Sequence, residues 1–86
     1  MKEYVVYILY SKVHKKTYVG FTSDLINRFI SHNIKGKKGW TIKYRPWEVV
    51  YVEFFKTKQS ALKKEKYLKS GVGREWIKSI LLQKAN

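Results

Sequence analysis

The sequence of 86 residues contains no cysteine, a single proline and only six acidic side chains. Without cysteine, disulfide bonds, thiolate zinc sites and a cysteine nucleophile are excluded. Two histidines, His14 and His32, are too few for a zinc site. The apolar run at residues 5–10 is too short for a signal-peptide core or a membrane span. We therefore expect one soluble, cytoplasmic domain, residues 1–86, that does not bind membranes.

Positive charge is the strongest feature that is present. Lysine and arginine number 19, which gives a formal net charge of +13. Such a field concentrates polyanions, and phosphate contacts supply most non-specific affinity for nucleic acid. The basic residues are spread over the whole chain, which disfavours a role restricted to anionic membranes. Nucleic acid is the expected partner.

The N-terminal segment predicts a β-hairpin that carries two tyrosines. Residues 3–10 and 17–21 are rich in β-branched and aromatic residues, and a polar stretch separates them. A four-residue loop at 11–14 would pair Tyr10 with Lys15 and Tyr7 with Tyr18, so that both phenols project from one face. A loop one residue longer or shorter would place them on opposite faces.

A helix is expected after Gly20, with cap candidates at residues 22–24. Its predicted buried stripe consists of Leu25, Ile26, Phe29 and Ile30. Arg28 and His32 lie together on the border of this stripe. The alternatives to a functional role are a solvated Arg28 and a His32 that bonds to backbone at the helix edge, and the residue types favour this alternative more for His32 than for Arg28.

Residues 33–47 predict a long exposed loop, because they contain two glycines, the proline, five basic residues and three aromatics. Cations and flat rings in one loop can neutralise phosphates and stack on bases. The candidate nucleic-acid contacts are Lys35, Lys37, Lys38, Trp40, Lys43 and Arg45.

The remaining chain predicts one strand and two helices. Residues 47–55 have a high apolar content, which favours a central strand covered on both faces. Thr57 is expected to cap a helix that runs to Lys69, with Gly71 as a left-handed cap, and a last helix spans residues 74–84.

Glu65 falls on the apolar face of the first of these helices, beside Ala61 and Leu68. A carboxylate directed toward a sheet is costly unless it meets a cation or a metal, which favours an ion-binding role. The alternative is an exposed glutamate paired with Lys69 one turn later.

Several short motifs together resemble the GIY-YIG nuclease superfamily: VVY at 5–7, YVG at 18–20, then Arg28 and the lone Glu65. YVGFT, His32-Asn33, RPWE and ALKKEKYLK are also similar to the eukaryotic junction and flap nuclease of this superfamily, and the chain resembles its small bacterial members and the N-terminal nuclease domain of the bacterial repair excinuclease. Two valines stand for Gly-Ile in the first motif, and no asparagine follows the glutamate helix before Asn86.

The resemblance implies an α+β fold with a three-stranded antiparallel sheet flanked by helices, in the order β-β-α-β-α-α. It also implies a DNA endonuclease that depends on Mg²⁺, or on Mn²⁺ as the alternative ion, and that acts on branched or damaged DNA in repair or recombination. The implied catalytic residues are Tyr7, Tyr18, Arg28, His32 and Glu65, with Glu65 as the metal ligand. A basic nucleic-acid-binding module without turnover, and a nuclease that needs a protein partner, remain open.

Overall fold

The computed structural model describes residues 3–35 and 40–85. Strands β1 (Tyr4–Ser11) and β2 (Lys16–Thr22) are followed by helix α1 (Leu25–Ile30) and the π-helical turn η1 (Ser31–Lys35). The 3-10 turn η2 (Trp40–Tyr44), strand β3 (Glu48–Phe55) and helices α2 (Lys58–Leu68) and α3 (Gly71–Ala85) complete the chain. The predicted α+β class and order of elements are confirmed. Within the described ranges, no helix combines the length and apolar content that crossing a bilayer requires.

The sheet is antiparallel in the order β2-β1-β3, so the central strand is β1. The prediction that residues 47–55 form the central strand is wrong. β1 is almost entirely buried, whereas Val52 and Phe54 on β3 expose 38% and 60% of their surface. A strand rich in apolar residues therefore occurs here at the outside of the sheet, and one of its faces is only partly covered.

The hairpin register places the two tyrosines diagonally rather than directly opposite each other. Ser11 pairs with Lys16, so the turn occupies residues 12–15, and Lys15 adopts a positive φ of 55°. Tyr7 faces Gly20 and Tyr18 faces Leu9, two residues away from the predicted pairing. A shift of two residues preserves the face, because side chains alternate with period 2. The two phenols therefore still share one side of the sheet.

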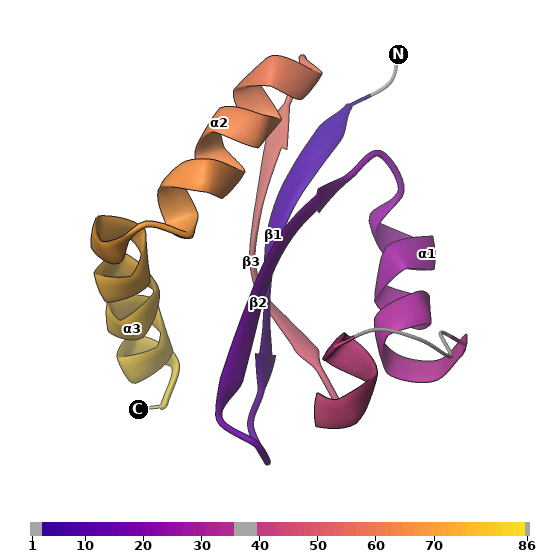
Figure 1. The fold of residues 1–86 in the computed structure, drawn as a ribbon, viewed down its shortest axis with the longest axis vertical. Coiled ribbons are helices and arrows are strands. Elements are labelled where there is room, and N and C mark those ends of the chain that lie inside the picture. The colour runs from indigo at the N-terminus through magenta and orange to yellow at the C-terminus, as the bar shows by residue number, and fades with distance from the viewer. Residues whose placement is uncertain (1–2, 36–39, 86) are drawn as a thin grey trace.

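Helices cover the two faces of the sheet separately (Figure 1). On one face, α2 and α3 bury a core of Val6, Ile8, Val19, Ala61, Leu68 and Ile77. On the other face, Leu25 and Phe29 of α1 pack against a second core of Val5, Tyr7, Leu9 and Trp47. Both tyrosines lie on the α1 face, and Glu65 belongs to the helix on the opposite face.

The helix ends differ partly from prediction. The Thr57 side chain accepts a hydrogen bond from Ser60 N, as expected of a helix cap. The predicted left-handed cap at Gly71 is wrong, because Lys69 caps α2 in a right-handed conformation and Gly71 already begins α3. Gly73 lets the two helices approach, since a Cβ there would lie 2.5 Å from Leu68 Cα.

In its described residues, the segment predicted as an exposed loop is largely structured. The end of η1 and the whole of η2 lie within it, and Thr41 and Trp47 are buried. The buried side chains of Thr41 and Trp47 thus hold this segment against the rest of the fold. The polar composition of the segment gave no indication of this burial. Ile26, predicted to be buried, is 74% exposed, because α1 is short and turns only Leu25 and Phe29 onto the sheet.

Candidate active site

Tyr7 and Tyr18 approach each other closely because a glycine lies beneath the Tyr7 ring. Their ring centroids are 6.2 Å apart. A Cβ on Gly20, the cross-strand partner of Tyr7, would lie 2.5 Å from Tyr7 Oη and 2.9 Å from Tyr18 Cε2. Any larger residue would displace the phenols. From the sequence, Gly20 was interpreted only as the end of a strand. Its position close after Tyr18 was the signal that could have indicated its contact with the phenols.

His32 joins this pair through both ring nitrogens. Tyr7 Oη lies 3.0 Å from His32 Nε2, and Thr41 Oγ1 lies 2.9 Å from His32 Nδ1. The His32 and Tyr18 rings are 4.9 Å apart. The residue-based expectation that His32 bonds to backbone at the helix edge is wrong. The imidazole is buried and hydrogen-bonded to side chains on either side.

A second layer of hydrogen bonds holds His32 in place. Asn33 Nδ2 donates to Trp47 O at 2.8 Å, and Trp47 N donates to Asn33 Oδ1 at 2.6 Å. Trp47 Nε1 donates to Thr41 O at 2.7 Å, and Arg45 Nε donates to His32 O at 2.6 Å. These bonds connect η1, η2 and the start of β3. Sequence reasoning assigned no role to Asn33, Thr41 or Trp47.

Burial dominates the electrostatics of the cluster. It raises the pKa of Tyr7 to about 12, and charge on Tyr18 adds to this effect. The Arg28 guanidinium opposes it through its charge and by hydrogen bonding to Tyr7. Tyr7 is therefore a neutral phenol at neutral pH, and Arg28 alone does not activate it. Burial, followed by the charges of Arg28 and Arg45, lowers the pKa of His32 below its usual 6.5. His32 is a neutral imidazole with one nitrogen able to accept a proton.

Helix α1 supplies Arg28 from its last turn. Asp24 precedes the helix, and its Oδ1 accepts a hydrogen bond from Asn27 N at 3.2 Å. The predicted cap is confirmed. Arg28 is exposed at the surface, so a substrate can reach its guanidinium.

Glu65 is partly buried on α2, with 19% of its side chain exposed. Its neighbours on the sheet side, Ala61 and Leu68, are fully buried. Glu65 Oε2 lies 3.8 Å from Lys69 Nζ, so both features weighed from the sequence, partial burial and the i,i+4 pair, are present. Among the described residues, no hydrogen bond or ion pair connects Glu65 to either tyrosine or to Arg28. The sheet lies between α2, which carries Glu65, and the face that carries the two tyrosines.

The potential metal ligands in the described residues suit a metal ion that takes few ligands from the protein. No group of three His, Cys, Asp or Glu residues that could hold a metal occurs in ranges 3–35 and 40–85. Mg²⁺ usually keeps several waters and binds through one or two carboxylates together with substrate phosphates. A single carboxylate such as Glu65, whose ion pair with an exposed lysine is long, fits that pattern.

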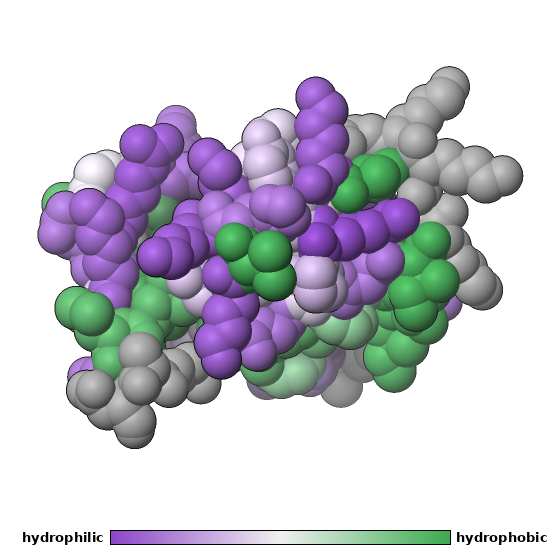
Figure 2. All heavy atoms as spheres, turned by 90° about the horizontal axis from the view of Figure 1, so that it is seen from below, coloured by the Kyte–Doolittle hydropathy of each residue, from purple (hydrophilic) through white to green (hydrophobic). Residues whose placement is uncertain are grey.

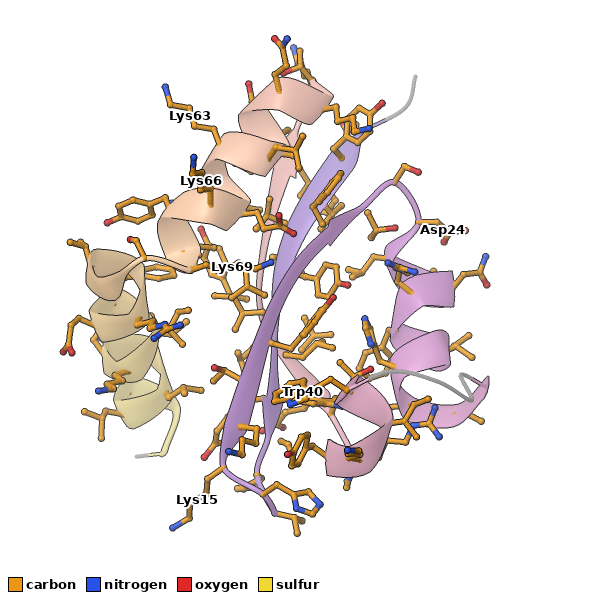
Figure 3. All side chains as sticks on the ribbon, viewed as in Figure 1. Lys15, Asp24, Trp40, Lys63, Lys66 and Lys69 are labelled. Atoms are coloured by element: carbon orange, nitrogen blue, oxygen red, sulfur yellow. The ribbon has the colours of Figure 1, made fainter. Side chains whose placement is uncertain are left out.

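The predicted nucleic-acid contacts have different environments. Trp40, labelled in Figure 3, is 46% exposed. Its ring centroid lies 4.6 Å from that of Tyr44. Lys43 is exposed, whereas Arg45 is partly buried and bonds to His32 O. Lys37 and Lys38 lie outside the described residues, as does the side chain of Lys35.

Comparison with known proteins identifies the family. A model of the GIY-YIG catalytic domain matches residues 3–77. UPF0213 protein SSP2268 of Staphylococcus saprophyticus is 34% identical over 80 residues, covering 93% of this chain and 96% of that protein. A structure-specific endonuclease subunit SLX1 homolog of Giardia intestinalis is 43% identical over 58 residues, covering 64% of this chain but 16% of that protein. The solution structure of UPF0213 protein BH0048 from Bacillus halodurans superimposes with a TM-score of 0.55 at 27% identity, covering 91% of this chain and 84% of that one.

Proposed function

Because the chain belongs to the GIY-YIG catalytic-domain family, we propose that it is a metal-dependent endonuclease that hydrolyses phosphodiester bonds in DNA. The observation that carries the proposal is the hydrogen bond between Tyr7 and His32, beside the exposed Arg28. The Giardia relative is named as a subunit of a structure-specific endonuclease, which supports branched DNA as the substrate and a role in repair or recombination. A cytoplasmic location is part of the proposal.

Glu65 would hold Mg²⁺, with Mn²⁺ as the alternative ion. When bound, such an ion stabilises negative charge on the leaving oxygen. The place where Glu65 and the tyrosines can share a substrate is the free edge of β2. Tyr18 projects from one face of this strand, and α2 packs against its other face.

Arg28 would clamp the non-bridging oxygens of the cleaved phosphate. Its planar guanidinium is permanently charged and can donate two parallel hydrogen bonds. Tyr18, which is half-buried next to Tyr7, would position the attacking water or the phosphate.

The proton path uses the neutral state of both Tyr7 and His32. When His32 Nδ1–H donates to Thr41 Oγ1, Nε2 is free to accept from the Tyr7 hydroxyl. Tyr7 Oη then takes a proton from the attacking water while its own proton moves to His32 Nε2. The phenol is neutral before and after the step, so its high pKa is no obstacle.

The test is a cleavage screen over nicked, flapped, forked and four-way DNA with Mg²⁺ or Mn²⁺. Glu65→Gln should lower cleavage by about 100-fold or more with little loss of DNA binding, because it removes the proposed metal ligand. Glu75→Gln is the matched control, since Glu75 is an exposed glutamate on α3 and its loss changes the net charge equally. It should cleave like the wild type.

A basic nucleic-acid-binding module is the second candidate, favoured by the position of Glu65 on the opposite side of the sheet from the tyrosines. Binding without cleavage of any substrate would support it. Cleavage that appears only after addition of native cell extract would instead indicate a nuclease that needs a protein partner.

A further inference from the structure

Two lysines of α2 and the lysine that caps it form a diagonal row on the outside of the helix. Lys69, Lys66 and Lys63, the lysine row, follow one another at three-residue spacing (Figure 3). Each step of three residues turns about 60° short of a full helical turn, so the row winds around the solvent side of the helix. Lys69 is the ion-pair partner of Glu65. Within the described part of the chain, Lys63 and Lys66 are exposed and make no ion pair.

The row ends at a hollow of about 430 Å³ between α2 and β3. This α2–β3 hollow is lined by Phe55, Ser60, Lys63, Lys64 and Tyr67. Tyr67 is 45% exposed, and Phe55 is partly buried. Two aromatic side chains therefore face a space that is open to solvent and rimmed by positive charge.

The far side of the hollow is held in place by Lys64. Its Nζ lies 3.6 Å from Glu53 Oε1, 5.3 Å from the Tyr67 ring centroid and 5.7 Å from the Trp76 ring centroid. These contacts pair the charge of Lys64 with Glu53 and place its ammonium group over the Tyr67 ring. The charge of Lys63 remains available to a ligand.

The α2–β3 hollow and Glu65 lie on opposite borders of the sheet-facing side of α2. At about 100° per residue, Glu65 falls on one side of the buried line from Ala61 to Leu68. Ser60, Lys64 and Tyr67 fall on the other side, toward β3. The lysine row crosses the outer surface of the helix between these borders, and thus connects Glu65 with the hollow.

We propose that the α2–β3 hollow binds an unpaired base of a single-stranded DNA segment, whose phosphates follow the lysine row. Flat apolar rings beside a cation suit a ligand with a planar base and a negative charge, and aromatic side chains stack on any unpaired base. A base within a duplex is already stacked and cannot enter. The inference rests on the proposed function and refines its substrate: DNA that has a single-stranded segment next to the cleaved bond.

Fluorescence anisotropy in EDTA tests the inference without cleavage, using a labelled single-stranded oligonucleotide, a blunt duplex and a free mononucleotide as competitor. Tyr67→Leu should weaken single-strand binding by about 5- to 100-fold and leave duplex binding within twofold, because only the unpaired base loses its stacking partner. Tyr67→Phe keeps the ring and should bind like the wild type. A mononucleotide should compete weakly, because it contacts only one end of the lysine row.

The lysine row is tested by the salt dependence of the same binding. The double variant Lys63→Gln and Lys66→Gln should lower the slope of log K against log[salt] by about 1.4 for the single strand. Lys12→Gln, in the hairpin turn, is the single-charge control and should change the slope far less. A direct readout is photocross-linking from 5-iodouracil in the single strand, which should label Tyr67.

Equal loss of single-strand and duplex affinity in Tyr67→Leu, or a change below twofold, would overturn the inference. So would cross-links confined to η2 and α1. Because these measurements use metal-free protein, a failure to cleave any DNA would contradict the proposed nuclease activity and leave this result intact.

Discussion

At the residue scale, the candidate site depends on a glycine, because it requires a position without a Cβ atom. Gly20 leaves space for the Tyr7 ring, and this space allows Tyr7 to reach His32 while staying near Tyr18. Protein interiors are close-packed, so an added methyl group has nowhere to go unless the phenol moves. The glycine of the YVG motif thus has a packing role.

Gly20→Ala should destabilise the fold by about 1–3 kcal/mol and lower cleavage, because the new methyl group displaces the Tyr7 ring. Urea unfolding and single-turnover cleavage measure the two effects. The double variant with Tyr7→Leu is the control, since leucine does not extend to the position of Oη. If Gly20→Ala costs the same in both backgrounds, the collision with Tyr7 is not its cause.

His32→Gln should reduce cleavage by about 100- to 10,000-fold while DNA binding changes less than twofold, because glutamine can fill the site but cannot accept the proton. The lowered pKa of His32 also sets the acid side of the wild-type profile. Cleavage should hold as pH falls to about 6.5 and decline only below it. A variant that retains the wild-type rate would remove His32 from the proton path.

The same lowered pKa predicts the direction of acid destabilisation. The unfolded chain takes up a proton on His32 near pH 6.5, whereas the folded protein does so at lower pH. The stability that the buried neutral imidazole contributes is therefore present above pH 6.5 and lost as pH falls through the folded pKa.

At the scale of elements, the junction between α2 and α3 contains two glycines with different surroundings. A Cβ at Gly73 would collide with the backbone of Tyr67 and Leu68, whereas a Cβ at Gly71 would meet nothing within 4 Å. The close approach turns α3 back so that Ile77 can pack beside Leu68.

Gly73→Ala should therefore cost about 1–3 kcal/mol, because the helices must separate. Gly71→Ala, two residues earlier in the same helix, is the matched control and should be neutral or stabilising by up to about 1 kcal/mol, since alanine favours helix. Thermal unfolding distinguishes them. Similar losses in both variants would show that the close approach is not responsible.

At the scale of the whole molecule, positive charge determines the character of the surface, and buried phenols determine the response to alkali. The hairpin end of the protein, viewed in Figure 2, is mainly hydrophilic, with apolar side chains in separate groups. A net charge of +13 keeps such a surface solvated and attracts polyanions of any structure, so the aromatic and hydrogen-bonded sites must provide selectivity.

The phenols make the protein sensitive to alkali. Tyr7 and Tyr51 have pKa values of about 12, raised by burial in both cases and, at Tyr51, also by the hydrogen bond and charge of Glu53. Both phenols are protonated in the folded and the unfolded chain below pH 10, and above it the unfolded chain loses protons first. Stability should therefore fall as pH rises from about 10 to about 12. Tyr51→Phe should reduce this fall, measured by urea unfolding. Ionisation of all seven tyrosines together near pH 10 would contradict the expectation.

Local patterns in the sequence were sufficient for the type and order of most elements. The β-branched and aromatic content of residues 4–10, the Thr57 cap and the spacing of Ile77, Ile80 and Leu81 act within a few residues, so they can be recognised without the fold. The shared face of Tyr7 and Tyr18 also followed from periodicity, although the exact pairing did not, because the turn position depends on the backbone conformation near Lys15.

Only the tertiary structure decided which strand is central, where His32 bonds and on which side of the sheet Glu65 lies. Each of these depends on contacts between residues distant in the chain, such as Tyr7 with His32 and Thr41 with Trp47. Amphipathic patterns specify that a face of a helix or strand is buried, but they do not specify which other element covers it. The residue types of the site can therefore be read from the sequence. Packing on the two sides of β1 determined which of these residues lie in contact.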